Sequence, residues 1–299
     1  MKILSFGSMN IDNTYSVDEF VQPGETMTAK NLSKFCGGKG LNQSIALASA
    51  GADVAHFGCV GEDGDILLDM LKSRGVNTDS VIRIDNITSG HAIIQVDSHG
   101  QNSILLYPGA NRRMTPELID RELEKYSCGD WLLIQNETNC LEYIMRAANK
   151  KGMKIAFNPS PMDGTVSTLP LELVDLFLVN EIEGAAVTGK EITEEITAEF
   201  EKLFPNAAVI LTLGKKGSIF KSEKDMLFQP SYCGTVKDTT GAGDTYTGFF
   251  IANYIKGVSL QECMRIAAMA STVQISRDGA AFAIPTKQEV LDALKNHCR

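Results

Sequence analysis

Short apolar runs alternate with stretches of helical spacing along most of the chain. The runs have the length of buried strands and lie at 3–7, 54–60, 131–135, 155–158, 176–180 and 209–213. Stretches with apolar residues every three or four positions follow several of them, at 41–49, 66–73 and 141–151. Because strands that take turns with helices form parallel βαβ units, the pattern predicts an α/β fold in which helices cover both faces of a central sheet.

Two segments depart from this alternation. Residues 15–35 contain short extended stretches, and residues 90–107 predict two strands joined by a turn at Ser98-His99-Gly100. Together they would form a small accessory sheet close to the polar motifs described below. We therefore expect lid segments at about 13–36 and 88–108, an edge extension without function being the alternative.

The last part of the chain predicts consecutive helices. Ser259 with Glu262, and Thr286 with Glu289, each match the capping-box pattern, in which two side chains satisfy the free N–H groups of a helix start. Both pairs are therefore expected to mark the beginning of a helix.

The glycine-rich segment 238–244 carries the strongest chemical signal. Gly241-Ala242-Gly243 precede an apolar helical pattern at 246–254, and free N–H groups at a helix start, together with the helix dipole, bind an oxyanion or a phosphate. Asp244 would lie in the first turn, where phosphoryl transfer needs a base that accepts a hydroxyl proton. The alternative is that Asp244 only stabilises the helix dipole.

Polar residues also cluster near earlier strands. Asn10 and Asp12 follow the first strand, at the strand end where α/β sheets bind ligands, and a carboxylate there can accept from two sugar hydroxyls. The cluster Gly37-Gly38-Lys39-Gly40 opens a helix that would bring Lys39 and Asn42 to a polyhydroxylated ligand. A plain turn residue at Asp12 and a plain turn-to-helix junction at the glycines are the alternatives.

Two later strand ends suit a metal ion and a nucleotide. Asn180 and Glu183 offer an amide and a carboxylate that would order hydrated magnesium. Thr212 is followed by a glycine turn, with Gly214 and Gly217, that a nucleotide would approach closely.

One further segment imitates a phosphate-binding loop. Residues 184–190 match its first seven positions, but Glu191 replaces the hydroxyl that binds magnesium, and the segment has the pattern of a helix end. We therefore expect no phosphate site there.

The composition of the chain argues against two classes of binding partner. Lys and Arg number 28 against 37 Asp and Glu, so the formal net charge is −9, and no run of basic residues offsets it. This balance argues against a nucleic-acid partner. No apolar stretch approaches the roughly 20 residues of a membrane span, and the first strand starts next to Met1. We expect one cytoplasmic domain, residues 1–299, without a membrane partner.

The cysteines have no metal or redox pattern. Four histidines show no zinc-ligand spacing, and the seven cysteines form no CxxC pair. They are expected to be reduced and mostly structural thiols, at positions 36, 59, 128, 140, 233, 263 and 298.

In their order and spacing these motifs resemble those of the ribokinase-like (phosphofructokinase-B type) sugar kinases along the whole chain. The matching segments are 7–12, 23–26, 37–43, 108–111, 158–161, 180–183, 212–214 and 238–244. The resemblance implies a central, mostly parallel sheet flanked by helices, with a small β-sheet lid that often forms the contact of a homodimer. It also implies transfer of the γ-phosphate of ATP to a sugar hydroxymethyl group.

The resemblance assigns roles to individual residues. Asp244 would be the base, and the amides of Gly241, Ala242 and Gly243 would form the anion hole. The sugar contacts would be Asn10, Asp12, Gly38, Lys39, Asn42 and Glu137, with an apolar lid wall of Ala92, Ile94 and Leu106. Magnesium and phosphate would be ordered by Asn180 and Glu183, and the nucleotide would be bordered by Asn180, Thr212, Gly214 and Gly217.

The family also implies a potassium ion behind the anion hole, held mostly by backbone carbonyls. Its expected ligands are Asp238, Thr240, Gln274, Arg277 and Gly279. The chain departs from the family at two places. Ala283 replaces a common serine ligand, and Asn136 replaces a common apolar residue beside the sugar.

We therefore expect an ATP-dependent kinase that phosphorylates O5 of D-ribose. Other acceptors, 2-deoxyribose or a nucleoside, are the alternatives. Nucleosides are disfavoured because the Gly37–Gly40 stretch and the lid resemble those of free-sugar kinases. A non-catalytic sugar or nucleotide sensor is the alternative of another class, and the intact Asp244 argues against it.

Overall fold

The computed structural model describes residues 1–297, so Cys298 lies outside the described residues. Its main sheet has eight strands, parallel from β12 to β4 and antiparallel at β13 and β14. From edge to edge they are β14 (Met226–Pro230), β13 (Gly217–Lys221), β12 (Ala208–Thr212), β11 (Leu176–Asn180), β10 (Lys154–Asn158), β9 (Trp131–Gln135), β1 (Ile3–Phe6) and β4 (Val54–Phe57).

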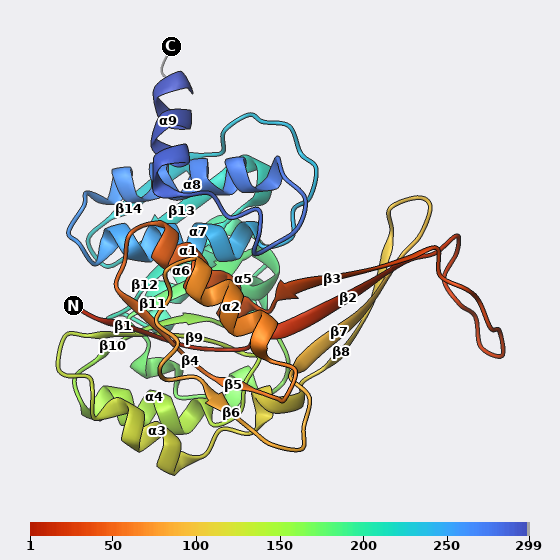
Figure 1. Cartoon of the computed structure of the whole chain (residues 1–299). Coiled ribbons are helices and arrows are strands. Elements are labelled where there is room, and N and C mark those ends of the chain that lie inside the picture. The colour runs from red at the N-terminus through yellow and green to blue at the C-terminus, as the bar shows by residue number, and fades with distance from the viewer. Residues whose placement is uncertain (298–299) are drawn as a thin grey trace.

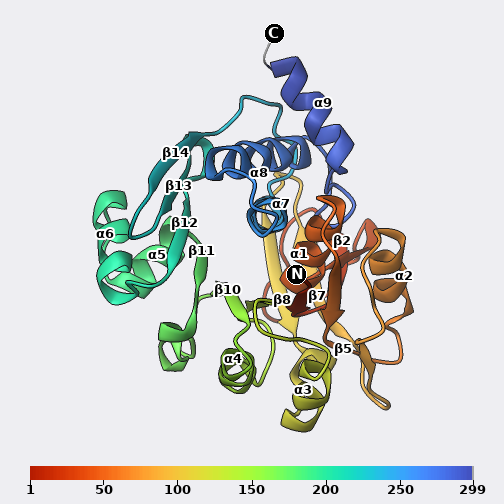
Figure 2. The same ribbon diagram turned by 90° about the vertical axis from the view of Figure 1, so that its left-hand side faces the viewer.

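Helices cover both faces of this sheet. One face carries α1 (Lys39–Ser49), α2 (Asp65–Ser73), α7 (Ala242–Tyr254) and α8 (Leu260–Ile275), with α9 (Lys287–His297) packed on α8. The other face carries α3 (Pro116–Leu123), α4 (Leu141–Lys150), α5 (Glu181–Thr188) and α6 (Thr193–Leu203). Figure 2 shows β11 and β12 between α5 and α6 on one side and α7 and α8 on the other. The predicted α/β fold is confirmed.

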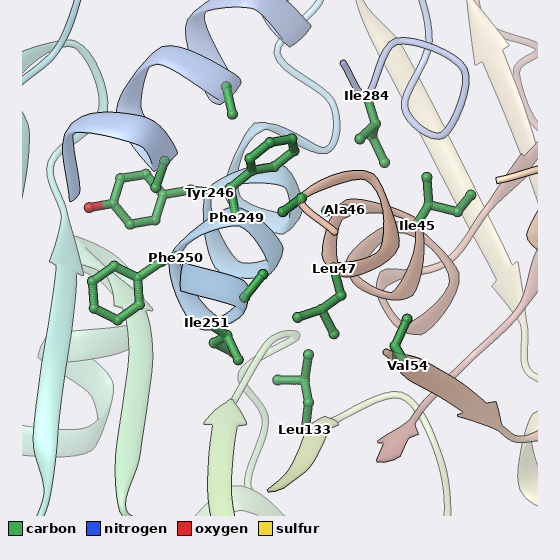
Figure 3. Close-up of a cluster of buried hydrophobic side chains, with 14 of the residues drawn as sticks. Ile45, Ala46, Leu47, Val54, Leu133, Tyr246, Phe249, Phe250, Ile251 and Ile284 are labelled. Atoms are coloured by element: carbon green, nitrogen blue, oxygen red, sulfur yellow. The ribbon is translucent and has the colours of Figure 1, made fainter. Parts of the chain in front are cut away.

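The alternation of side chains along the strands builds two cores. Ile3 and Leu133 belong to the core under α1 and α7, while Leu4 and Leu132 belong to the core under α3 and α4. Figure 3 shows the first core, where α1 and α7 lie side by side. Gly248 permits this approach, since a Cβ there would lie 2.3 Å from Ala46 Cβ. The close contact brings the starts of both helices to the same end of the sheet.

A second sheet extends away from the body (Figure 1). Its four strands, in spatial order, are β3 (Asn31–Gly37), β2 (Asn10–Ser16), β7 (Gly90–Val96) and β8 (Asn102–Tyr107). We call these four strands the lid sheet. β7 and β8 are joined across Ser98-His99-Gly100, as predicted, with Gly100 at a φ of 78°.

Short elements complete the described fold. A two-stranded pair joins β5 (Cys59–Val60) to β6 (Ile82–Arg83), and four 3-10 turns lie at η1 (Gly109–Arg112), η2 (Val166–Thr168), η3 (Leu171–Leu173) and η4 (Gly214–Lys216). The single strand expected over 54–60 is therefore wrong. The chain leaves the main sheet at Gly58, where a Cβ would lie 2.5 Å from the Gly7 carbonyl oxygen.

Of the two capping boxes that the sequence predicts in the last part of the chain, one is formed in the structure. Thr286 and Glu289 bond each other's backbone N–H groups, so this capping box is confirmed. Ser259 makes no side-chain cap bond, and the Glu262 carboxylate is paired with Arg265 rather than with the helix start, so this predicted capping box is wrong. The imitation phosphate loop covers the last turn of α5 and its left-handed cap at Gly189, as expected for a helix end.

Two global observations concern the described residues. No helix within 1–297 has both the length and the apolar character needed to cross a membrane. The six cysteines in that range are free thiols, as predicted.

Candidate active site

A cavity of about 240 Å³ lies where the carboxyl ends of β10, β11 and β12 meet the start of α7. Open α/β sheets bind ligands at this edge. The cavity is lined by Lys39, Asn158, Leu178, Val179, Asn180, Glu183, Ile210, Thr212, Thr239, Gly241, Ala242, Gly243, Asp244, Tyr246 and Thr247. The lining residues thus come from segments as far apart in the sequence as Lys39 and Thr247, and many were predicted as site residues.

The start of α7 has the geometry of an anion site. Gly241 adopts a φ of 80°, and no side chain caps the helix, so the position is open to an external anion. The Ala242 N–H donates to the Thr239 carbonyl at 3.2 Å. An anion that uses this amide must share it with that bond.

Asp244 is buried at the base of the cavity, with 6% of its surface exposed. Asn42 Nδ2 donates to its Oδ2 at 3.0 Å, and Gln43 Nε2 donates to its Oδ1 at 2.9 Å. Both amides come from α1, which the Gly248 contact holds against α7. The carboxylate is therefore oriented by two donors rather than by solvent.

Sequence reasoning missed the residues behind this pair. Gln43 also donates to Asn158 Oδ1 at 3.2 Å, and its Oε1 accepts from Gln135 Nε2 at 2.8 Å. Asn158 Nδ2 in turn donates to the Leu178 carbonyl at 2.8 Å. The available signal was a polar residue at the end of an apolar strand, as Gln135 ends β9 and Asn158 ends β10.

Glu137 lies beside the start of α1. Its Oε2 accepts from the Ser8 hydroxyl and from the Lys39 N–H, the latter at 2.9 Å. Gly38 precedes the helix with a φ of 92°. Burial raises the pKa of Glu137; the bonds from Ser8 and Lys39 act against this rise and the charge of Asp244 adds to it.

Asp12 lies on β2 and faces Gly37 on β3. A Cβ at Gly37 would lie 2.1 Å from Asp12 Oδ2, so a larger residue there would displace the Asp12 carboxylate. Burial, and then the charge of Glu137, raise the pKa of Asp12 to about 7. Near neutral pH this carboxyl therefore exchanges its proton readily.

Asn10 is held by a neighbour that sequence reasoning missed. Asn111 Nδ2 donates to Asn10 Oδ1 at 2.8 Å, and Asn111 Oδ1 accepts from the Met9 N–H at 3.0 Å. Asn10 is buried, and its own NH₂ group remains for a ligand. Asn111 belongs to the segment 108–111 matched to the family, which was the signal for it.

The ammonium group of Lys39 interacts electrostatically with three carboxylates of the site. Burial by itself lowers the pKa of its ammonium, but the charges of Asp244, Glu137 and Glu183 outweigh burial and raise it. The side chain lines the cavity as a cation.

Asn180 and Glu183 bond each other at a helix start, which the sequence did not lead us to predict. They form a capping box at the start of α5, with Asn180 Oδ1 accepting from the Glu183 N–H at 2.9 Å and Glu183 Oε2 from the Asn180 N–H at 3.1 Å. Both residues still line the cavity. No group of three or more His, Cys, Asp or Glu within residues 1–297 is arranged to hold a metal directly. The pair fits a magnesium ion bound through its water shell.

The predicted nucleotide residues are partly at the cavity. Thr212 lines it, whereas Gly214, which begins η4, and Gly217, which follows η4, are not among the lining residues. Gly217 has a further reason to be glycine: its φ is 125°, and a Cβ would lie 2.1 Å from the Gln229 carbonyl oxygen on β14.

Comparison with known proteins decides the family. The chain matches the pfkB family of carbohydrate kinases over residues 1–287. The chain belongs to that family. A ribokinase from Haemophilus influenzae is 33% identical over 97% of each chain. A solved ribokinase from Arabidopsis thaliana, complexed with ribose and ATP, has a TM-score of 0.85 at 29% identity over 98% of each chain. A deoxyribokinase from Salmonella typhi is 29% identical over 97% of each chain.

The sugar-kinase family predicted from the motifs is thereby confirmed, and the chain is a carbohydrate kinase. In this carbohydrate kinase the lid sheet places the expected apolar residues on the face of Asp12. In the strand register, Ala92 on β7 lies opposite Asp12 on β2 and opposite Leu106 on β8. Ile94 lies two positions further along β7 and therefore on the same face of the sheet. Ala92 is buried, while Leu106 is 47% exposed.

The expected potassium ligands lie together behind the start of α7. Asp238 accepts from the N–H groups of Thr240 at 2.8 Å and Gly279 at 3.0 Å. Gln274 donates to the carbonyls of Thr240 and, at 3.4 Å, of Gly279. Gln274 is fully buried, and its Oε1 has no hydrogen-bond partner. A buried acceptor without a partner fits a cation or a water at this position.

The remaining predicted positions contribute less directly. The side chain of Arg277 pairs with Glu289, which leaves only its backbone for a cation. Ala283 is buried and offers no side-chain ligand. Asn136 donates to the Pro161 carbonyl at 2.8 Å and to Asp163 at 3.1 Å, so its amide is engaged with the loop after β10.

Proposed function

We propose that this carbohydrate kinase transfers the γ-phosphate of ATP to the O5 hydroxyl of D-ribose and releases ribose 5-phosphate. The observation that carries the proposal is the buried Asp244 carboxylate, held by two amides at the open start of α7. A ribokinase solved with ribose and ATP is similar in sequence and fold over the whole chain. Intact carboxylate and helix start favour a catalyst over a sensor.

The sugar end of the site would be formed by Asn10, Asp12, Gly38, Lys39, Asn42 and Glu137. Asn42 supports this directly, because its Oδ1 is buried without a hydrogen-bond partner and a sugar hydroxyl would supply the missing donor. The NH₂ group of Asn10 and the carboxylates of Asp12 and Glu137 complement the remaining hydroxyls. Ala92, Ile94 and Leu106 would close over the apolar edge of the sugar.

In the reaction the O5 hydroxyl attacks the γ-phosphorus in line. The bond from O5 to phosphorus forms, the bond from phosphorus to the bridging oxygen of ADP breaks, and Asp244 takes the hydroxyl proton. The amides of Gly241, Ala242 and Gly243, with the positive end of the α7 dipole, stabilise the charge on the transferred group. Lys39, which lines the same cavity as a cation, adds to this stabilisation.

Two cations complete the proposal. Magnesium bound with ATP neutralises phosphate charge, and Asn180 and Glu183 would hold its water shell. Potassium would lie among Asp238, Thr240, Gln274, Arg277 and Gly279. There it would keep the loop before α7 in the conformation that presents the anion-hole amides, and Thr212, Gly214 and Gly217 would border the nucleotide.

The lid sheet supports a homodimer as a further part of the proposal. β8 has a run of exposed apolar residues, with Ile104 58%, Leu105 68% and Tyr107 48% exposed. Such a surface favours contact with a second copy of the chain. We further propose a cytoplasmic enzyme whose ligands are the free sugar and ATP, without nucleic acid or membrane as partners.

A panel of pentoses, deoxypentoses, hexoses and nucleosides in a coupled ADP-release assay tests the acceptor. Loss of a hydroxyl that pairs with a buried acceptor costs about 1 to 3 kcal/mol, so ribose is expected to exceed 2-deoxyribose in kcat/KM by about tenfold or more. Adenosine is expected to be a poor acceptor, because the apolar lid wall offers its base no hydrogen bond. A deoxyribose or adenosine rate equal to that of ribose would refute the acceptor, and no turnover with any sugar would indicate a sensor.

A further inference from the structure

Two neighbouring amides on α1 contact the same carboxylate but differ in their other bonds. Asn42 Nδ2 donates to Asp244 Oδ2, while Asn42 Oδ1 is buried without a partner. Gln43, which is fully buried, uses its amide completely: Nε2 donates to Asp244 Oδ1 and to Asn158 Oδ1, and Oε1 accepts from Gln135 Nε2. Asn42 therefore keeps hydrogen-bonding capacity for a ligand, and Gln43 does not.

The partners of Gln43 fix the direction of its amide. Asn158 uses its own NH₂ group on the Leu178 carbonyl, so it presents an oxygen to Gln43. Gln135 presents an NH₂ group from the adjacent strand, and it pairs in register with Asn158. With its nitrogen toward Asn158 and Asp244, Gln43 offers a donor to the oxygens of both, whereas the opposite orientation would place an oxygen against each. Asn158 at the end of β10 thus determines which group Asp244 meets.

We propose that Gln43 is a positioning residue that holds Oδ1 of Asp244 and leaves Oδ2 to accept the proton of the sugar hydroxyl. Oδ2 lies on the side of Asn42, the residue with the free acceptor for a ligand. A base works only when the correct oxygen lies within hydrogen-bond reach of the proton, and small misplacements are costly. This inference rests on the proposed role of Asp244 as the base.

The first test replaces Gln43 by Met, which keeps the size of the side chain and removes its polar atoms. We expect kcat to fall by about 10- to 100-fold while the KM values for ribose and ATP change by less than about threefold. Asn253→Leu is a matched control, because Asn253 is another buried amide at the far end of α7 and donates only to the Phe249 carbonyl. Its kcat should stay within about twofold of the parent.

A double-mutant cycle separates positioning from a structural role. If Gln43 acts through Asp244, Gln43→Met should change the residual rate of Asp244→Asn by less than about twofold. If Gln43 had only a structural role, Gln43→Met would lower kcat by the same factor in the parent enzyme and in the Asp244→Asn variant. Should the Met variant not fold, Gln43→Glu keeps the shape and the acceptor for Gln135 but places an oxygen against Asp244, and we expect at least as large a loss of kcat.

The outcomes distinguish the inference from the proposed function. Full activity in Asp244→Asn would overturn the base assignment itself. A large loss in Asp244→Asn with normal activity in the Gln43 variants, or with losses that multiply, would overturn the positioning role alone. A loss in both single variants that does not multiply in the pair supports the inference.

Discussion

Two aspartates of the site, Asp244 and Asp12, lie in different regions of the molecule and have different surroundings. Asp244 lies in the body, on α7, and each of its oxygens accepts an amide N–H. Asp12 lies on the lid sheet, where no donor within residues 1–297 contacts its carboxylate and its pKa is raised to about 7. In the proposed function, the body thus holds Asp244 in a fixed position for proton transfer, whereas Asp12 on the lid sheet would gain its partners from the hydroxyls of the sugar.

This difference separates chemistry from acceptor binding. The two amides at Asp244 come from α1, and residues at the ends of β9 and β10 hold the amide of Gln43, so its geometry does not depend on a ligand. The surroundings of Asp12 depend on the strands β2, β3 and β7, which project from the body (Figure 1). Substitution of Asp244 should therefore change kcat, and substitution of Asp12 should change the KM for the sugar.

The largest expected effect comes from the body. Asp244→Asn should lower kcat by roughly 10²- to 10⁴-fold, the usual contribution of a general base, as measured in a coupled ADP-release assay at saturating ribose and ATP. Turnover close to that of the parent would rule out Asp244 as the base.

The next effect comes from the lid sheet. Asp12→Asn removes a charged acceptor for sugar hydroxyls, and a lost bond of this kind costs about 1 to 3 kcal/mol. We expect the KM for ribose to rise by about 10- to 100-fold with kcat changed by only a few fold, as read from ribose saturation curves. If kcat fell and KM stayed constant, the division between body and lid would be wrong.

The pH dependence sharpens the role of Asp12. Because its pKa is raised to about 7, the carboxyl of the empty enzyme is mostly neutral below that pH and loses its charge for the hydroxyls. The kcat/KM for ribose should therefore fall by up to about tenfold per pH unit as the pH drops below about 7. Asp12→Asn should remove this limb of the profile. A limb that persists in the variant would belong to another group.

A smaller effect is expected from the cation behind α7. The loop from Asp238 to Gly241 leads directly into the proposed anion-hole amides, so a monovalent cation bound there should raise the rate a few fold in potassium over an equal concentration of a bulky organic cation. Equal rates in the two salts would mean that the site holds no cation during turnover, and Ala283 would be the first residue to examine.

Local sequence signals predicted much of this arrangement. The strand–helix alternation indicated the fold, and the glycines before Asp244 indicated the anion site because a helix start is a local feature. The network of Gln43, Gln135 and Asn158 could not be predicted, since it joins positions 92 and 115 residues apart. Such contacts depend on the order of the strands in the sheet, which no single segment specifies.

Helix capping illustrates how local patterns also fail. Ser259 and Glu262 have the capping-box spacing, yet Arg265, three residues further on, takes the carboxylate. Asn180 and Glu183 were interpreted only as ligands, although they form a capping box and line the cavity as well. The same spacing therefore occurs with and without the capping bonds, and pairing with an arginine does not by itself prevent them, since Glu289 pairs with Arg277 and still caps its helix.

Ribose binding to the Asp244→Asn enzyme without ATP, measured by calorimetry beside its turnover, tests the separation of chemistry from acceptor binding most directly. We predict a ribose dissociation constant within about threefold of the parent, together with a turnover at least about 10²-fold lower. A loss of ribose affinity as large as the loss of turnover would contradict the account, because Asp244 would then act in binding the sugar rather than in removing its proton.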